Sequence, residues 1–568
     1  MVGQIFKRIT APVRGLVLRP IRSLHQAAYL LAGLTLASQV LALLRDRAFA
    51  HTFGAGQTLD LYYAAFRVPD LVFALVSSLV SAYVLIPRIT GMDRTETRTL
   101  LSESATFLLG LGGTLSVALF VWMPNFLAFL YPDLMHTAAR DEFILLSRLL
   151  LLQPILLGLS GVLASVTQVH RRFVLFALSP ILYNLGIIFG ALVLYPRFGL
   201  IGIGWGVVIG ALAYLFVHVP VVIEAGVLPT LRWPQMSVMA SVVRDSVPRS
   251  LALGMGAVTA LALTALASQA GTGAVSIFTF ASNLEAVPLG LIGASYAVAA
   301  FPALSEASAL DRRSEFTNIL SASARHVILW SLVAFGLIVV LRAHLVRVIL
   351  GTGAFDWNAT RLTAALLAIF VVGLAAQGLI LLFSRALYAA RKSWQPLLYQ
   401  VIGGILTVAL AYFLLTLPPD GFPRTLATLL KVGDLQGTPI LLLAFAATLG
   451  QLGLLGCLLF ALRNVTPGLA RTLLRPVIDG SIAALVGGAA AYGTLLIGGS
   501  IAPLTTLMAV FIEGALAGIV GLIFAALALY VVENEEFRIV FAALEKLVRA
   551  REERATALAP SAEEPLRP

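Results

Sequence analysis

Long uninterrupted apolar runs dominate the chain and predict its secondary structure. About fourteen stretches of roughly 20 residues are apolar enough to cross a bilayer as α-helices, and short polar loops join them. Their centres lie near residues 38, 73, 110, 155, 184, 211, 256, 287, 330, 373, 404, 450, 485 and 518. The pattern therefore predicts an all-α polytopic membrane protein with nearly the whole chain inside the bilayer.

Composition supports this prediction and excludes an ordinary soluble protein. Hydrophobic residues make up 59% of the chain and charged residues 12%, whereas soluble domains carry about 25% charged residues. The net charge of +11 does not indicate nucleic-acid binding, because the basic residues lie in loops where topology and anionic headgroups explain them. The only cysteine, Cys457, lies in an apolar span, so the chain forms no intrachain disulfide.

Basic residues alternate between successive loops and predict the orientation. Loops after the even-numbered spans are rich in arginine and lysine, whereas those after spans one, seven and thirteen have none. Basic residues also precede the first span. The positive-inside rule therefore places both termini in the cytoplasm, which an even number of spans allows.

Weak internal similarity predicts that the first six spans repeat as spans seven to twelve. Three matches lie 215 to 217 residues apart: Gly54 with Gly271, Pro87 with Pro302, and Pro180 with Pro396. Internal repeats are typical of transporters. The predicted divisions are a basic cytoplasmic segment at 1–25, an N-lobe at 26–228, a C-lobe at 229–465, helices thirteen and fourteen at 466–532, and a charged cytoplasmic tail at 533–568.

Charged residues cluster in the first two spans. Arg45, Asp46, Asp60, Arg67 and Asp70 all lie in this hairpin. A charge within the membrane is expensive unless it pairs with another charge or lines a polar cavity. Arginines can bind phosphate groups through two parallel hydrogen bonds. The cluster therefore suggests a transport cavity for an anionic passenger.

The same hairpin resembles the MurJ/MviN family of lipid II flippases within the multidrug/oligosaccharidyl-lipid/polysaccharide exporter superfamily. The shared pattern is S-x-V-L-x-x-x-R-D-x-x-x-A-x-x-F-G-A-G followed by D-x-x-x-x-A-F-[RK]-x-P. Here it comprises Ser38, Val40, Leu41, Arg45, Asp46, Ala50, residues 53–56, Asp60, Ala65, Phe66, Arg67 and Pro69. Residues 287–293 and 301–305 resemble the eighth helix of that family.

The resemblance implies a two-lobed transporter in the bacterial cytoplasmic membrane. Helices one, two, seven and eight would line a cationic cavity, and helices thirteen and fourteen would form a groove for a polyprenyl tail. The passenger would be lipid II, a disaccharide-pentapeptide on undecaprenyl pyrophosphate, moved from the inner to the outer leaflet by alternating access. We expect no cofactor, because no ATP-binding motif is present, and expect the membrane potential or an ion gradient to drive transport.

The chain keeps only one of the four cavity arginines that the resemblance implies, Arg45. The other three positions fall on Gln39, Phe73 and Asn283. The predicted substrate-binding residues are Arg45, Arg67, Gln39, Asp60, Asn283 and Glu285, and Asp46 and Asp70 are predicted to be structural or pairing residues. The seven histidines show no metal-ligand spacing, and no metal site is predicted.

Two other functions stay open because three cavity arginines are absent. The first keeps the fold and changes the passenger to another lipid-linked saccharide. The second is a non-transporting membrane scaffold that recruits cell-wall synthesis proteins through the tail after Glu533.

Overall fold

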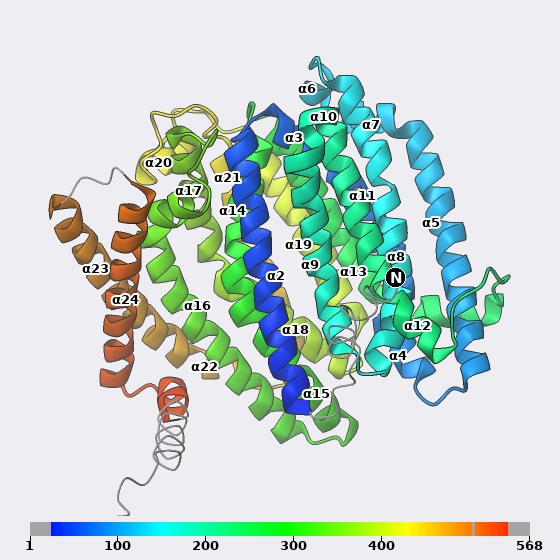
Figure 1. Cartoon of the computed structure of the whole chain (residues 1–568). Coiled ribbons are helices and arrows are strands. Elements are labelled where there is room, and N and C mark those ends of the chain that lie inside the picture. Colours follow the sequence, from blue (N-terminus) through cyan, green and yellow to red (C-terminus); the bar gives the residue numbers. More distant parts are fainter. Residues whose placement is uncertain (1–23, 502–505, 543–568) are drawn as a thin grey trace, which may run out of the picture. The chain divides into compact units, whose positions relative to one another are not determined.

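Helices make up every regular element that the structure describes. A computed structural model describes residues 24–501 and 506–542, and no strand occurs within them (Figure 1). The helices of the first half are α2 (Leu24–Phe53), α3 (Gln57–Leu75), η1 (Ser77–Val80), α4 (Ala82–Ile89), α5 (Arg94–Leu130), α6 (Pro132–Met135), α7 (Arg140–Leu150), α8 (Leu152–Val169), α9 (Phe173–Phe189), η2 (Gly190–Leu194), α10 (Tyr195–Phe198), α11 (Leu200–Phe216), α12 (Val219–Ala225) and α13 (Met236–Ser268). Those of the second half are α14 (Ala274–Leu289), η3 (Gly290–Ala294), α15 (Ser295–Ala309), α16 (Arg313–Ile349), α17 (Trp357–Val372), α18 (Leu374–Ala389), α19 (Trp394–Leu415), α20 (Phe422–Leu429), α21 (Ile440–Leu462), α22 (Leu469–Thr472), α23 (Leu474–Ile501) and α24 (Leu507–Val531).

These helices account for the fourteen predicted spans. Eleven of the described helices, counted through their short breaks, are long and apolar enough to cross a membrane, and two bent helix pairs raise the number to 13. These thirteen coincide with predicted spans two to fourteen, and α2 coincides with the first. The tenth span bends by 46° between α17 and α18, at Gly373. Most of the predicted N-terminal segment and tail, residues 1–23 and 543–568, lies outside the described residues.

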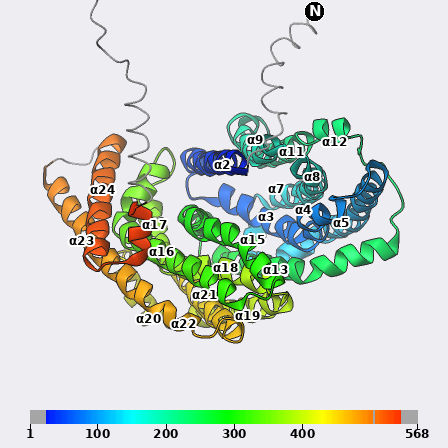
Figure 2. The ribbon, with the colours of Figure 1, turned by 90° about the horizontal axis from the view of Figure 1, so that it is seen from below.

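The chain divides into two compact units. Unit 1 comprises residues 1–287, 345–373 and 390–460, and unit 2 comprises residues 288–344, 374–389 and 461–568. In unit 1, α9 packs between α2 and α11, and α13 packs against both α3 and α19 (Figure 2). In unit 2, α23 and α24 lie side by side, and α15 packs against α18. The lobe boundaries drawn from the sequence stay a prediction.

Glycines allow α9 and α11 to approach closely. A Cβ atom on Gly206 of α11 would overlap the backbone of Gly190, and one on Gly210 would lie 2.6 Å from the carbonyl oxygen of Tyr183. Small residues at such a crossing let two helix backbones come into contact. This contact holds α9 in place, and α9 carries one residue of the candidate site.

The turns after the fourth and tenth predicted spans share a backbone feature. Arg171 and Arg391 follow the fourth and tenth spans, 220 residues apart, and each adopts a positive φ, of 56° and 58°. Positive φ is uncommon for residues other than glycine, so its occurrence at matching places is informative. Arg171 lies nine residues before Pro180, whereas Arg391 lies five residues before Pro396, so the two turns differ in their spacing to the matched prolines.

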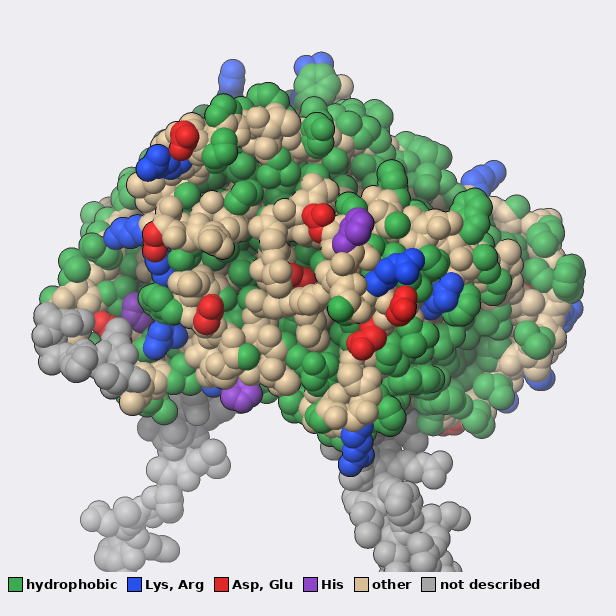
Figure 3. Space-filling model, turned by 90° about the horizontal axis from the view of Figure 1, so that it is seen from above, with side chains coloured by type: hydrophobic (Ala, Val, Ile, Leu, Met, Phe, Trp, Pro, Cys, Tyr) green, Lys and Arg blue, Asp and Glu red, His purple; other side chains and the backbone are tan. Residues whose placement is uncertain are grey.

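Successive loops of unit 1 lie at alternate ends of its helices. Loops after the second, fourth and sixth spans meet at one end, where Arg94, Arg172 and Glu224 line a common pocket. Nη2 of Arg172 lies 2.6 Å from Oε1 of Glu224 there. Figure 3 is seen from above the view of Figure 1 and shows charged side chains scattered among hydrophobic side chains and exposed backbone.

Candidate functional site

Arg45 and Asp46 lie in the C-terminal half of α2 and form an ion pair. The Nε and Nη2 atoms of Arg45 both donate to Oδ1 of Asp46, at 3.0 and 2.8 Å. The carboxylate is buried, and 20% of the arginine side chain is exposed. Desolvating two charges is offset only when the geometry is close and further hydrogen bonds are made. Additional partners are therefore expected around this pair.

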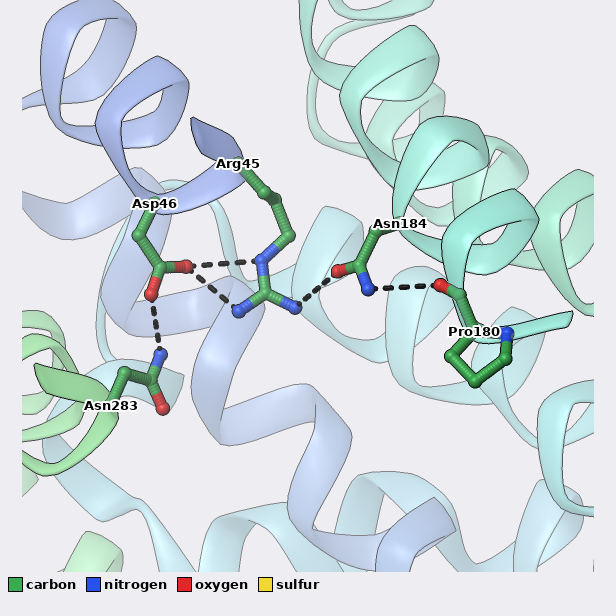
Figure 4. Close-up of polar contacts among 5 residues, drawn as sticks. All are labelled: Arg45, Asp46, Pro180, Asn184 and Asn283. Carbon is green, nitrogen blue, oxygen red and sulfur yellow. Dashed lines mark hydrogen bonds and ion pairs between the residues drawn. The ribbon is translucent and has the colours of Figure 1, made fainter. Parts of the chain in front are cut away.

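Two asparagines from other helices supply these partners (Figure 4). Nη1 of Arg45 donates to Oδ1 of Asn184 on α9 at 3.0 Å. Nδ2 of Asn283 on α14 donates to Oδ2 of Asp46, also at 3.0 Å. Nδ2 of Asn184 donates to the carbonyl of Pro180, which orients the amide oxygen toward Arg45. The network thus joins the first, fifth and eighth predicted spans.

Aromatic side chains of α2 and α3 border the ion pair. Tyr62 and Tyr63 are buried and lie within electrostatic range of Arg45. The ring of Phe49 meets that of Tyr62 edge to face, with the centroids 5.1 Å apart. Within the described residues, the buried hydroxyl of Tyr63 has no hydrogen-bond partner. This hydroxyl is therefore a free polar group beside the charged pair.

Arg67 and Asp70 lie one turn apart on α3 and contact different helices. Nε of Arg67 donates to Oγ1 of Thr264 on α13 at 2.8 Å. Asp70 interacts with the amide of Gln153 on α8 as well as with the charge of Arg67. The second predicted arginine is therefore fixed by a contact between the second and seventh spans.

Asp60 caps a helix from another part of the chain. Its carboxylate is buried and accepts the backbone N–H groups of Gly273 and Ser276, at 2.5 and 2.8 Å. The hydroxyl of Ser276 donates to the same carboxylate at 2.7 Å. Gly273 directly precedes α14 and Ser276 lies in its first turn, where backbone N–H groups have no partner within the helix and where the helix dipole favours an anion. In this conformation the carboxylate has no face exposed to a substrate, and it joins α3 to α14.

The remaining predicted residues lie on α2 and α14. Gln39 is half-buried and lies seven residues before Asp46, on the same face of α2. Glu285 is buried on α14, two residues after Asn283. Phe73, at an implied arginine position, is 39% exposed and apolar. No group of three His, Cys, Asp or Glu side chains in the described residues has the arrangement of a metal site.

Two members of the arrangement, Asn184 and Thr264, were missed in the sequence. Asn184 could have been found, because an amide within an apolar span usually bonds to another helix, and it closes the motif that begins at Pro180. Thr264 gives no such indication, because threonines within membrane helices commonly bond to their own backbone. Its hydroxyl does donate to the carbonyl of Ala260, and only the structure reveals the additional bond from Arg67.

Comparison with known proteins places the chain in a family. Residues 49–432 match the family described as "Lipid II flippase MurJ", which is more than half of the chain. The chain belongs to the lipid II flippase MurJ family. Arg45 and Asp46 lie just before the matched segment, so membership rests on residues other than this pair.

Curated relatives and solved structures agree with this family. A lipid II flippase MurJ from Burkholderia cenocepacia is 24% identical over 402 residues, which cover 68% of this chain and 77% of that protein. A probable lipid II flippase MurJ from Thermotoga maritima is 26% identical over 382 residues, 66% of this chain and 76% of that protein. A lipid II flippase MurJ structure in an inward closed conformation has a TM-score of 0.70 at 19% identity, and covers 89% of this chain and 100% of its own.

A more distant likeness extends to the wider superfamily. An inward-facing multidrug resistance MATE family transporter of the MOP superfamily has a TM-score of 0.62 at 14% identity, and covers 76% of this chain and 96% of its own. These likenesses confirm the all-α, multi-pass fold predicted from the sequence. Family membership confirms a transporter family rather than an enzyme family, and a multi-pass protein of the bacterial inner membrane.

Proposed function

We propose that this chain moves lipid II from the inner to the outer leaflet of the bacterial cytoplasmic membrane. Membership of the lipid II flippase MurJ family carries the proposal. The 11 to 13 candidate membrane spans of the described residues and the buried Arg45 network support it. Membrane lipids and the lipid-linked precursor are the expected partners. The proposed topology has both termini in the cytoplasm.

Arg45 is the residue best suited to bind the pyrophosphate. A guanidinium has five N–H groups, and the described residues accept three of those of Arg45. Two N–H groups therefore stay available, and one fifth of the side chain is exposed. Asp46 and Asn184 hold the planar group in one orientation, which reduces the entropy lost when a phosphate binds. In the proposed function Arg67 adds a second cation and the amides contact the sugars.

Alternating access requires that contacts at each end of unit 1 break in turn. At one end, Asp60 joins α3 to the start of α14. At the other end, Nη2 of Arg88 on α4 lies 2.6 Å from Oδ2 of Asp245 on α13. Both contacts are present together in this conformation. We propose that the first opens to release the passenger outside and the second opens to admit it, with the membrane potential or an ion gradient as the driving force.

Another lipid-linked saccharide is the second candidate passenger, because Gln39, Phe73 and Asn283 replace implied arginines. Three lipids separate the candidates: lipid II, undecaprenyl pyrophosphate and undecaprenyl phosphate. Each would be titrated into the purified chain and into the Arg45→Ala variant, and binding would be followed by native mass spectrometry. Arg47→Ala is the matched control, because Nη1 of Arg47 donates to the carbonyl of Val348, outside the network.

The proposal predicts that lipid II binds more tightly than the other two lipids and that only Arg45→Ala weakens it. Equal binding of all three lipids, unaffected by Arg45→Ala, would overturn the lipid II assignment. That result would favour another saccharide or a scaffold that recruits cell-wall proteins through its tail, most of which lies outside the described residues.

A further inference from the structure

A pocket of about 470 Å³ lies at the end of unit 1 where the loops after the second, fourth and sixth predicted spans meet. Its walls come from the turn between α4 and α5, from the end of α8 and the residues after it, and from α12, which lie together in Figure 2. A volume of this size is typical of a ligand site. The charged side chains of the lining are Asp93, Arg94, Arg172 and Glu224, and His170 lies among them. None of the lining residues belongs to the Arg45 network, so the pocket is a separate candidate site.

The pocket lies at the depth where four membrane-spanning segments begin or end. One segment begins at Arg94, and the other three end at Ile89, Val169 and Ala225. The ends of spanning helices lie at the level of the lipid headgroups. Basic pockets between helices at the cytoplasmic surface bind such headgroups. In the proposed topology this end faces the cytoplasm, so its position favours a headgroup of the inner leaflet.

The two arginines of the pocket keep N–H groups without an acceptor. The side chain of Arg172 is 14% exposed, and within the described residues it makes one hydrogen bond, from Nη2 to Oε1 of Glu224 at 2.6 Å. A guanidinium has five N–H groups, so four of those of Arg172 stay unpaired. Arg94 is exposed, and its side chain has no partner within the described residues. Phosphate oxygens match the geometry of such groups.

The two carboxylates of the pocket also keep oxygen atoms free. Oε2 of Glu224 has no partner within the described residues, and the side chain is 55% exposed. Oδ1 of Asp93 accepts the backbone N–H of Glu96 at 2.7 Å, whereas Oδ2 is unpaired in the same part of the chain. The charges of the two arginines and two carboxylates sum to zero. The lining therefore complements a ligand that carries one positive and one negative group better than it complements a simple anion.

Apolar side chains form the rest of the lining. Val166, Val221 and Val227 are buried, at 1 to 3% exposed, and Met92 is 39% exposed. A free ion in water gains nothing from such walls, whereas an amphiphile buries apolar atoms against them. The combination of paired opposite charges and apolar walls at headgroup depth is that expected for a lipid.

We propose that the pocket binds the headgroup of a phospholipid that carries both a phosphate and a primary ammonium group. Arg94 and Arg172 bind the phosphate, and the free oxygens of Glu224 and Asp93 accept hydrogen bonds from the ammonium. A primary ammonium has three N–H groups to donate, whereas a trimethylated one has none. The site therefore distinguishes phosphatidylethanolamine from phosphatidylcholine, and the bound lipid joins the α4–α5 turn to α12.

Lipid titrations followed by native mass spectrometry test this site. The purified full chain in detergent micelles would receive phosphatidylethanolamine, phosphatidylcholine or phosphatidylglycerol, all with the same acyl chains, and the wild type should bind the first most tightly. Arg94→Ala should weaken phosphatidylethanolamine binding about fivefold, the usual contribution of one basic residue near a headgroup. Arg244→Ala is the matched control and should stay within about twofold, because Arg244 is an exposed arginine of α13 that does not line the pocket.

Glu224→Gln gives a second test whose sign depends on the lipid. The variant loses an acceptor for the ammonium and frees Arg172 from its counter-ion. Phosphatidylethanolamine should therefore bind more weakly and the anionic phosphatidylglycerol more tightly, which shifts the ratio of the two affinities about fivefold or more. Glu315→Gln is the control, because Glu315 pairs with Arg312 at 3.4 Å outside the pocket and should leave the ratio unchanged.

Equal binding of the three lipids by the wild type would overturn the proposal, as would equal effects of Arg94→Ala and Arg244→Ala. An unchanged ratio in Glu224→Gln would also overturn it. Phosphoethanolamine, the headgroup alone, is the last probe: binding as tight as that of the lipid would show a site for a soluble zwitterion and refute the lipid assignment. None of these measurements involves transport, so failure of the proposed lipid II function would leave their outcome unchanged.

Discussion

Replacing Arg45 with alanine should damage both the stability and the function of the chain. Asp46 now accepts two hydrogen bonds from Arg45 and one from Asn283, and its side chain is 4% exposed. Arg45→Ala leaves this buried charge with one neutral partner. Removing one partner of a buried ion pair costs about 3–5 kcal/mol. Because 20% of the Arg45 side chain is exposed, we expect a lower value here, about 2–3 kcal/mol in the free energy of unfolding.

A second substitution separates the two effects. Adding Asp46→Asn to Arg45→Ala removes the stranded charge, and its amide oxygen can still accept the bond from Asn283. We expect this double variant to recover about 2 kcal/mol of the lost stability. Transport should stay lost, because the oriented guanidinium of Arg45 is absent and Arg67 alone does not replace it. Arg45→Lys should also transport poorly, since an ammonium cannot reproduce the bonds to both Asp46 and Asn184.

Chemical unfolding in nanodiscs and lipid II transfer in proteoliposomes would measure the two quantities on the same preparations. Arg47→Ala serves as the control and should leave transport near the wild-type rate. Recovery of transport in the double variant would refute the argument, because Arg45 would then act only as the counter-ion of Asp46. Unchanged stability in Arg45→Ala would refute the energetic estimate.

Three further predictions concern other parts of the chain. Gly206→Ala should lower the free energy of unfolding by about 1–3 kcal/mol, because the added Cβ would overlap the backbone of Gly190. Gly113→Ala is the control and should not lower it, because no atom lies within 4 Å of the added Cβ. Chemical unfolding of the two variants measures the difference. Asp60→Ala removes three hydrogen bonds from the start of α14 and should lower the free energy of unfolding by about 1–2 kcal/mol. Cysteines introduced at that end of unit 1 should also be labelled faster in this variant, which gives a second measurement. The two hydrogen bonds from Arg361, each of 2.7 Å, lower the pKa of Asp434. The contact is therefore fully present at pH values above about 3.9 and is lost as the pH falls through the lowered pKa of Asp434. Hydrogen exchange should show residues 431–437 protected until the pH falls through this lowered pKa, and Arg361→Gln should lose the protection at a higher pH.

The membrane fold could be predicted because each span is specified by its own residues. A run of about 20 apolar residues forms a helix in a bilayer whatever its neighbours are, since its backbone must satisfy its hydrogen bonds internally. The break at Gly373 could not be predicted from hydropathy, because Val372 and Leu374 continue the apolar run on either side of it. The bend depends on packing, because a Cβ atom on Gly373 would lie 3.1 Å from Oε1 of Gln451.

The candidate site could be predicted only in part. The charges of the first hairpin stand out because they interrupt apolar helices, and a local pair such as Arg45 with Asp46 follows from adjacency. The cap that Asp60 provides to Ser276 joins residues 216 positions apart, so no local pattern indicates it. The bond from Arg67 to Thr264 likewise spans 197 positions. Both depend on how helices pack, which a single sequence does not specify residue by residue.

The balance of charge around Arg45 limits how this chain could bind an anion. The family resemblance implies several arginines, whose combined field would attract a pyrophosphate from a distance. Here Asn283 occupies one of those positions and bonds to Asp46, and Asp46 neutralises Arg45. A neutral pair with two directed N–H groups attracts at short range and depends on orientation. Recognition by this chain should therefore depend on the fixed geometry of one guanidinium, which is the reason that Arg45→Lys is expected to fail although it preserves the charge.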